Sequence, residues 1–463
     1  MKKSLLWLIV LVLSISIIGA FSVTGCKEET AEEEVAEEEE VTEEEVAATE
    51  EETVEEFEPV TIEYWNVNTG EFGGLQVEEF IENFNATNDK NITVNQVSYG
   101  GNYAQLNMSL QSSLAAGIYP GVIQVSYAAL NYFAENFPQH TDLETIINEY
   151  APQDSDFLDN KYNPLVIELA RSANGRLLGL PYGFSVPLTY YNKDIFREAG
   201  LDPEDPPETW QEVYEYSVKI KEETGKYGMF IQSYPDTYCI IPIFLSNGID
   251  SMFEPDGDGG YKTTFNNEKA IEAWTTIQDL TLEGLNANLV HEEGISGFLA
   301  GEIGMCITTS GRASYVANEV DFDAGAAEFP KFNDEQLAVC IGGNMLTIFA
   351  KTDSEVLACW EFEKYLLDPD QINTWVRGTG YLPSTKDGVE DPEGLKPYLD
   401  ETPMMITAIQ QRDEAARPWT SWPGANGLQI DQHLVDMRDA IMSGEDVATV
   451  IGRTASDIDE LLK

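Results

Sequence analysis

Apolar and polar positions alternate along residues 59–463 in a pattern that predicts strands separated by helices. TIEYWNV alternates with period two, as expected of a strand with one buried face, and Val77, Phe80 and Phe84 then recur at helical spacing. ITVNQVSY predicts a second strand, residues 103–116 a second helix, and GVIQVSY a third strand. This alternation favours a parallel sheet with right-handed crossovers, in which ligands gather at the carboxyl ends of the strands.

Local start signals define the later elements. VPLTYYN, IGMCITT and AVCIGGNMLTIFA predict three more strands. Thr209 and Glu212 form a T-x-x-E capping box that opens a helix, and Asn266 or Asn267 caps another. A long amphipathic helix is expected to begin at Ser354, and the last helix closes with DIDELLK. Three tryptophans lie at core spacing on these helices and are assigned to packing: Trp210, Trp274 and Trp360.

The first residues predict export. Two lysines precede an apolar run from Leu5 to Phe21, as in a signal peptide. The following SVTGC resembles a bacterial lipobox, in which removal of residues 1–25 leaves Cys26 at the N-terminus to carry a diacylglycerol. Residues 26–58 are almost only Glu, Ala, Val and Thr, so they cannot bury a core and predict a solvated tether. We therefore expect an extracytoplasmic protein that Cys26 anchors to the membrane.

Charge and cysteine content exclude some classes of protein. The formal net charge is -56, and no basic stripe is present to neutralise phosphates, which argues against nucleic-acid binding. Four cysteines beyond the lipobox are widely spaced without a metal-binding motif, so buried thiols and disulfides both remain open: Cys239, Cys306, Cys340 and Cys359. We predict no metal and no cofactor.

The central part of the chain resembles a known family. GLPYGFSVPLTYYNKDIFREAGLDPEDPPETWQEV resembles the signature stretch of family 1 extracellular solute-binding proteins, which include maltose- and glycerol-3-phosphate-binding proteins. FLAGEIGMCITTSGR, GGNMLTIFAKTDSEVLACWEFEKYL and TGYLPSTK resemble further family segments in the same order. The resemblance implies an α/β, two-lobed periplasmic-binding-protein fold of type II, each lobe a mostly parallel sheet flanked by helices, with a multi-crossover hinge. It also implies an N-lobe of residues 59–186 and 343–380 and a C-lobe of residues 187–342 and 381–463.

The same resemblance implies positions for ligand contacts. GGNYAQLNMSLQSSLAAGIYPGVIQVSY resembles the glycerol-3-phosphate-binding branch of the family. Family contacts then fall at or beside six residues: Tyr103, Ser185, Tyr234, Tyr238, Gly343 and Tyr381. Tyr127 stands where that branch has a glutamate, and SWPGANGLQI has no counterpart of its phosphate-contacting arginine. Because a phosphate needs charge-assisted donors, these two departures favour a sugar over glycerol-3-phosphate.

Sugars present flat C–H faces and a rim of hydroxyls, so their sites need aromatic plates and neutral hydrogen-bonding groups. The candidate plates stand at strand ends and in loops: Trp65, Tyr103, Tyr127, Tyr234, Tyr238, Tyr381, Trp419 and Trp422. The candidate hydrogen-bonding groups are Asn66, Ser185, Asn344 and Arg312. Arg312 also keeps a phosphate ligand open, because it supplies a cation from a different wall.

Together these features predict a monomeric, lipid-anchored substrate-binding protein of an ABC importer, which captures a mono- or oligosaccharide and delivers it to a membrane permease. A glycerol-3-phosphate or glycerophosphodiester binder is the alternative ligand class. A glycosidase is disfavoured because His140, His291 and His433 are isolated and no G-x-S-x-G, H-E-x-x-H or P-loop motif is present. A surface adhesion or sensing lipoprotein is the third class, for which the acidic tether would also suit.

Overall fold

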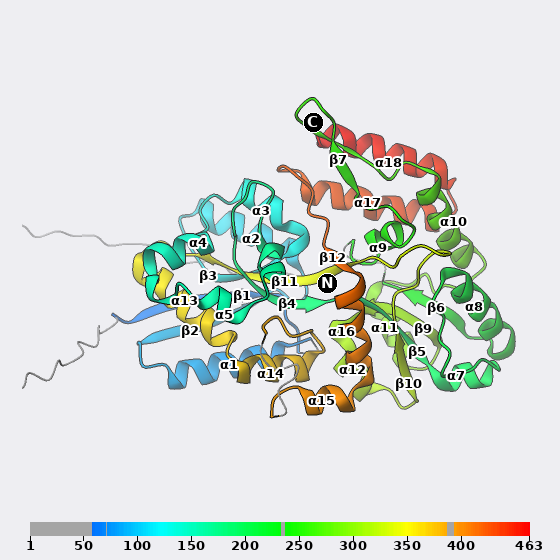
Figure 1. Ribbon diagram of the computed structural model, residues 1–463, viewed down its shortest axis with the longest axis horizontal. Coiled ribbons are helices and arrows are strands. Elements are labelled where there is room, and N and C mark those ends of the chain that lie inside the picture. Colours follow the sequence, from blue (N-terminus) through cyan, green and yellow to red (C-terminus); the bar gives the residue numbers. More distant parts are fainter. Residues whose placement is uncertain (1–57, 71, 233–236, 387–392) are drawn as a thin grey trace, which may run out of the picture. The chain divides into compact units, whose positions relative to one another are not determined.

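The computed structural model describes residues 58–463 except Glu71, 233–236 and 387–392 (Figure 1). The predicted signal peptide, Cys26 and all but the last residue of the predicted tether therefore lie outside the described residues. Of the helices in the described ranges, none has the length and hydrophobicity that crossing a bilayer requires.

The first sheet follows the strand and helix alternation expected from the sequence. β1 lies parallel to both β2 and β3, whereas β11 runs antiparallel to β3 and to β4, and parallel to β12. Figure 1 shows α1, α2, α3 and α13 around this sheet. The strands are β1 (Val60–Asn66), β2 (Ile92–Ser98), β3 (Gly121–Ser126), β4 (Leu180–Ser185), β11 (Val339–Phe349) and β12 (Ala416–Pro418). The helices are α1 (Gly74–Thr87), α2 (Tyr103–Ala115), α3 (Leu130–Asn136) and α13 (Asp353–Leu366).

The second sheet is mixed, which differs from the mostly parallel sheet expected here. β5 pairs antiparallel with both β10 and β9, and only β6 and β9 are parallel. β5 is the first strand of this sheet along the chain and enters it directly from β4 of the first sheet, so its direction is set by the crossing between the sheets and not by a helical crossover within this one. Its strands are β5 (Pro187–Asn192), β6 (Tyr227–Ile231), β9 (Ile303–Thr309) and β10 (Ala324–Ala327). The helices near it in Figure 1 are α7 (Lys193–Glu198), α8 (Trp210–Thr224), α10 (Glu268–Leu282) and α11 (His291–Leu299).

The remaining elements are short helices and a hairpin, followed by the C-terminal helices. The hairpin consists of β7 (Phe253–Pro255) and β8 (Tyr261–Thr263). The 3₁₀ turns η1 (Tyr127–Ala129) and η5 (Ser310–Arg312) follow β3 and β9. The helices are α4 (Leu143–Thr145), α5 (Phe157–Lys161), α6 (Pro164–Ile167), α9 (Ile240–Leu245), α12 (Ala313–Glu319), α14 (Pro369–Thr379), α15 (Lys396–Glu401), α16 (Pro403–Ala415), α17 (Gly427–Met442) and α18 (Val447–Leu461).

Helix caps confirm most of the start signals. The capping box at Thr209 opens α8, and the Asn267 side chain accepts from the first turn of α10, which decides between the two asparagines. The expected start at Ser354 is one residue late. α13 begins at Asp353 and Thr352 caps it, because the Thr352 hydroxyl and the Glu355 carboxylate each accept a backbone N–H of the other residue. Ser354 lies inside the first turn.

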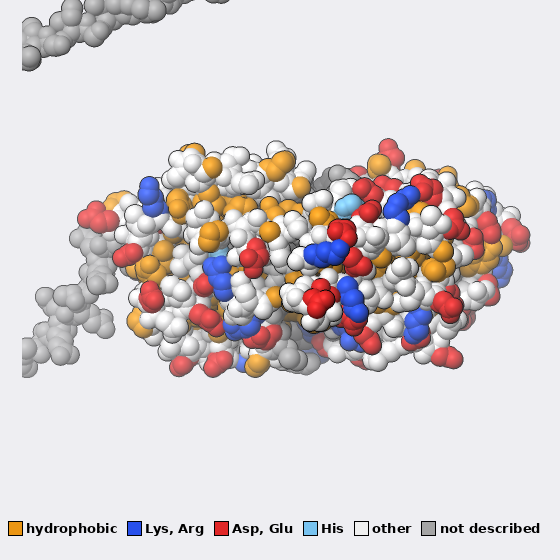
Figure 2. All heavy atoms as spheres, turned by 90° about the horizontal axis from the view of Figure 1, so that it is seen from above, with side chains coloured by type: hydrophobic (Ala, Val, Ile, Leu, Met, Phe, Trp, Pro, Cys, Tyr) orange, Lys and Arg blue, Asp and Glu red, His pale blue; other side chains and the backbone are white. Residues whose placement is uncertain are grey.

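The buried residues agree with the packing assignments. Trp210, Trp274 and Trp360 are all fully buried, and the four cysteines beyond Cys26 are buried thiols. The surface carries the acidic excess: Figure 2 shows Asp and Glu side chains spread over that face, with Lys and Arg side chains scattered between them.

The chain passes between the sheets at a hydrogen-bonded crossing. Val186, between β4 and β5, donates its N–H to Ser310 Oγ at 3.1 Å, and its carbonyl accepts from Ser310 N at 2.8 Å. Gln411 of α16 is fully buried beside it, where its Nε2 donates to the Pro187 carbonyl at 2.7 Å and its Oε1 accepts from Phe329 N at 2.6 Å. This crossing places the ends of β4 and β11 next to the loops of the second sheet.

Candidate functional site

Ser185 and Tyr238 meet where β4 ends. Ser185 lies opposite Gly342 of β11, and the Tyr238 hydroxyl donates to Ser185 Oγ at 3.0 Å. A Cβ atom on Gly342 would lie 2.1 Å from the Tyr238 ring, so only glycine leaves room for that ring. Trp419 packs on Tyr238 with a centroid separation of 5.1 Å and donates its Nε1 to Thr237 Oγ1 at 3.4 Å. Tyr238 thus contacts two other predicted site residues, Ser185 and Trp419, that come from distant segments of the chain.

Asn344 is a buried amide without a hydrogen bond. It lies opposite Gly183 of β4, it is 1% exposed, and neither its Oδ1 nor its Nδ2 has a hydrogen-bond partner among the residues that the structure describes. Gly343 before it adopts φ 116°, and a Cβ there would lie 2.0 Å from the Gly183 carbonyl oxygen. A Cβ added to Gly183 would lie 2.9 Å from Asn344 Nδ2 and 3.3 Å from the Tyr381 ring. Burying an amide unsatisfied costs about 1–3 kcal/mol, so this arrangement favours a polar ligand as its partner.

An aromatic column extends from Tyr381. Its ring stacks on Trp375 at 5.4 Å with an interplanar angle of 12°, and it also packs against Phe72 at 5.2 Å. The Arg312 guanidinium lies 5.8 Å from the Phe72 centroid, within the range of a cation–π contact. Sequence reasoning missed Phe72 and Trp375; the position of Phe72 in a glycine-flanked turn after the first strand was the available signal.

Arg312 is already paired with acidic and neutral groups. Its Nη2 donates to Glu292 Oε1 at 3.0 Å and lies 3.3 Å from His291 Nε2, and its side chain is only 11% exposed. Burial, reinforced by the positive charge of Arg312, lowers the pKa of His291 to about 4. His291 is therefore neutral at physiological pH, and Glu292 balances the charge of Arg312.

Two predicted residues at the end of β1 serve the local structure. Asn66 Oδ1 accepts from Asn68 N at 3.2 Å, and its Nδ2 donates to a backbone carbonyl, so its amide shapes the turn after the strand. Trp65 donates its Nε1 to Glu63 Oε2 at 2.7 Å and packs against Tyr99 at 5.3 Å. Both are buried, and neither is brought into the group around Ser185 by a ring contact or hydrogen bond that joins described residues.

Tyr127 and Tyr103 lie near this group. The Tyr127 ring packs on Phe184 of β4 at 5.7 Å. Burial raises the pKa of the Tyr127 phenol well above its usual value, and the neighbouring phenols of Tyr103 and Tyr381 add to the shift. These three tyrosines therefore share one region at the carboxyl ends of the strands. Tyr234 lies outside the described residues.

Trp422 packs elsewhere. Its Nε1 donates to Asp431 of α17 at 3.1 Å, and its ring contacts Phe253 of β7 at 5.4 Å. The side chain is fully buried, and among described residues its ring and hydrogen-bond contacts do not include the group around Ser185. Trp419 joins that group and Trp422 does not, although only two residues separate them.

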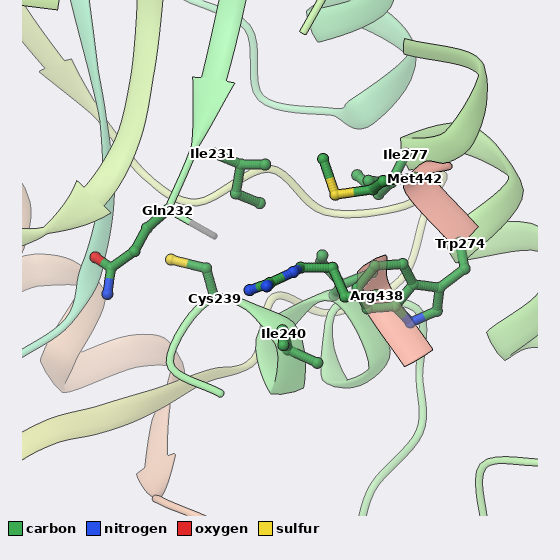
Figure 3. Close-up of a pocket in the computed structure, with 9 residues that line it drawn as sticks. Ile231, Gln232, Cys239, Ile240, Trp274, Ile277, Arg438 and Met442 are labelled. Carbon is green, nitrogen blue, oxygen red and sulfur yellow. The ribbon is translucent and has the colours of Figure 1, made fainter. Parts of the chain in front are cut away.

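A small cavity lies behind β6 (Figure 3). Its volume is about 10 Å³, room for roughly one water molecule, so it does not accommodate a sugar. In Figure 3 the Arg438 guanidinium points toward Cys239 and Gln232, and Arg438 Nη1 has no hydrogen-bond partner within the described part of the chain. Elsewhere in the described ranges, no group of three His, Cys, Asp or Glu side chains is arranged to hold a metal ion.

Comparisons with known proteins agree with this architecture. The sn-glycerol-3-phosphate-binding periplasmic protein UgpB of Escherichia coli strain K12 is 26% identical over 362 residues, covering 76% of this chain and 80% of that protein. UgpB of Shigella flexneri serotype 5b is 27% identical with the same coverage. Among solved structures, UgpB from Mycobacterium tuberculosis in complex with glycerophosphocholine superposes with a TM-score of 0.73 at 21% identity, covering 88% of this chain and 99% of that one.

Maltose-bound MalE3 of T. maritima gives a TM-score of 0.73 at 20% identity and covers 87% of this chain and all of that one. These superpositions confirm the predicted type II periplasmic-binding-protein fold. The family model described as bacterial extracellular solute-binding protein matches residues 79–398, more than half of the sequence. The chain therefore belongs to the bacterial extracellular solute-binding protein family.

Proposed function

We propose that this protein is the substrate-binding component of an ABC importer and that it captures a carbohydrate and delivers it unchanged to a membrane permease. The observation that carries the proposal is the Asn344 amide, which has no hydrogen-bond partner among the described residues and lies with the Tyr381 ring above Gly183, two residues along β11 from the Gly342 position that faces Tyr238. A polyol satisfies such an amide with its hydroxyls while its C–H faces cover the rings. The names of similar structures, maltose-bound MalE3 among them, support this ligand class.

The charge around the site favours a neutral ligand. Arg312 is paired with Glu292 and covered by Phe72, so it offers no uncompensated charge to a phosphate. The second candidate is glycerol-3-phosphate or a glycerophosphodiester, which the names of the UgpB relatives support. Binding of such a ligand requires Arg312 to break its ion pair with Glu292 and to pair with the phosphate instead.

We also propose the mechanical basis of capture. The N-lobe consists of residues 59–186 and 343–380, with β1 to β4 and most of β11, and the C-lobe consists of residues 187–342 and 381–463, so that β12 joins the first sheet from the C-lobe part of the chain. A ligand that contacts both lobes stabilises the closed arrangement by its differential binding free energy. The Tyr238–Ser185 hydrogen bond, which joins a loop of one sheet to a strand of the other, supports this placement of the ligand.

The proposal includes the location and the partners. Cys26 carries the lipid anchor, residues 26–58 act as a spacer, and the permease recognises the closed monomer outside the cytoplasm. The proposed protein binds its saccharide without cleaving it, unlike a glycosidase. It passes the saccharide to a transporter, unlike an adhesion or sensing lipoprotein. Adjacent genes for two multi-span permease subunits would support transport, and their absence would favour adhesion or sensing.

A thermal-shift screen tests the ligand class. Purified protein that begins at residue 27 is heated with mono- and oligosaccharides, polyols, glycerol-3-phosphate and glycerophosphocholine. A ligand at 100 times its Kd stabilises the fold by about 2.7 kcal/mol, which gives a shift of several degrees. A shift with a saccharide, recovered chemically unaltered, is expected. A shift with glycerol-3-phosphate and none with any saccharide would refute the carbohydrate proposal in favour of the second candidate ligand. Recovery of a chemically altered saccharide would instead favour the glycosidase hypothesis.

A further inference from the structure

The segment that carries Trp419 crosses from one sheet to the helices of the other. We call residues 419–426 the strap; it follows β12, which pairs with β11 of the first sheet, and it leads into α17 (Figure 1). On one side Trp419 contacts Tyr238, and Trp422 contacts Phe253, both in segments of the second sheet's part of the chain. The strap therefore holds a candidate ligand plate between two sets of packing partners.

Asn131 of α3 binds the other side of the strap. Its backbone N–H donates to Ser421 Oγ at 2.9 Å, and its Nδ2 donates to the Ser421 carbonyl at 2.9 Å. Asn131 is 8% exposed, and its Oδ1 accepts from Ala173 N at 2.8 Å, so its backbone N–H and both side-chain polar atoms are satisfied. Asn136 adds a bond to the Ala425 carbonyl at 3.3 Å.

The Asn131–Ser421 contact satisfies a backbone N–H group at the start of α3. The first N–H groups of a helix have no partner within the helix, and the N–H of Asn131 lies in the first turn of α3. Ser421, 290 positions later in the chain, accepts from that group through its hydroxyl. Trp419 is two residues before Ser421, so fixing Ser421 also limits the positions that the Trp419 ring can take.

We infer that the Asn131–Ser421 pair ties the strap to α3 and thereby holds Trp419 against the ligand, which makes Asn131 and Ser421 positioning residues for ligand retention. The inference rests on the proposed function. Neither residue is required to touch the ligand. Breaking the tie frees the strap to lift, so a bound ligand escapes faster while its entry is little changed.

Two substitutions separate the tie from the rest of α3. Asn131→Asp keeps an oxygen that accepts from Ala173 and replaces the amide that donates to Ser421 by a carboxylate oxygen facing a carbonyl. Ser421→Ala removes the acceptor of the Asn131 N–H, and Ser421→Thr restores a hydroxyl at the same place. With the saccharide that gives the largest thermal shift, we expect both disrupting variants to raise the dissociation rate constant about tenfold, and Ser421→Thr to stay near wild type.

Hydrogen exchange of strap amides provides a readout that needs no ligand. Faster exchange over residues 419–426 in Asn131→Asp, beyond any general rise over the other described segments of the ligand-free protein, is the expected result. If exchange rises but no saccharide or glycerol phosphate binds wild type, the proposed function fails and the tie stands. If a saccharide dissociates from both disrupting variants at the wild-type rate, or if exchange over the strap is unchanged, the tie is refuted and the proposed function is unaffected.

Discussion

Replacing Gly342 by alanine tests the packing of the site most directly. A Cβ there would lie 2.1 Å from the Tyr238 ring and 2.9 Å from Ser185 Oγ, while Gly342 is not among the residues with positive φ, so the backbone accepts alanine. Carbon atoms pack at about 3.5–4.0 Å, and the ring must therefore move by about 1.5 Å. This movement breaks the Tyr238–Ser185 hydrogen bond and shifts the ring from Trp419.

The magnitude follows from these two contacts. A net hydrogen bond contributes about 0.5–1.5 kcal/mol and an aromatic pair a similar amount, so the arrangement around Ser185 loses about 1–3 kcal/mol. If the ligand binds this arrangement, its Kd rises by roughly fivefold to 150-fold, since 1.4 kcal/mol is a factor of ten.

Calorimetric titration of the saccharide found in the thermal screen measures this effect. Gly452→Ala in α18 is the matched control, because its Cβ would meet only Asn266 at 4.0 Å and helix propensity favours alanine. Tyr238→Ala should abolish the penalty of the methyl group, so the double variant Gly342→Ala with Tyr238→Ala binds no worse than Tyr238→Ala alone. A wild-type Kd for Gly342→Ala would refute the assignment of the site to this crossing.

Three further outcomes are expected. Burial raises the pKa of Glu363 well above 4.5, so the stability that this carboxyl contributes is present below pH 4.5 and is lost as pH rises toward its folded pKa. Glu363→Gln should therefore flatten the fall in the free energy of unfolding as pH rises above 4.5, measured by urea unfolding, and an unchanged pH slope would contradict this. Glu292→Gln leaves Arg312 unbalanced and should increase the thermal shift given by glycerol-3-phosphate but not that given by a saccharide. Trp422→Phe should lower the free energy of unfolding by about 1 kcal/mol, because it loses the hydrogen bond to Asp431, and should leave ligand affinity unchanged. Trp419→Ala should weaken ligand binding. Equal effects of the two substitutions on affinity would contradict the assignment of Trp419, and not Trp422, to the ligand site.

Features that depend on neighbouring residues were predictable from the sequence. Period-two and helical spacing located the strands and most helices, and the capping box at Thr209 opens a helix because its hydrogen bonds close within four residues. Ser354 was the wrong start for α13 because Thr352 offers the better reciprocal bond to Glu355. The resemblance to solute-binding proteins predicted how these elements assemble into a type II fold, which the superpositions confirm.

The grouping of site residues depends on contacts between distant segments, which no local pattern encodes. Gly342 is an ordinary position of an apolar strand in the sequence, and only the pairing of β4 with β11 brings Ser185 opposite it and Gly183 opposite the candidate Asn344. Trp419 and Trp422 look alike in a loop rich in small residues, yet one packs on Tyr238 and the other on Phe253. The sequence by itself therefore determined the elements, the family and the chemistry of the candidates. Only the tertiary structure decided which candidates meet, because side-chain neighbours are set by strand register and by the crossing between sheets.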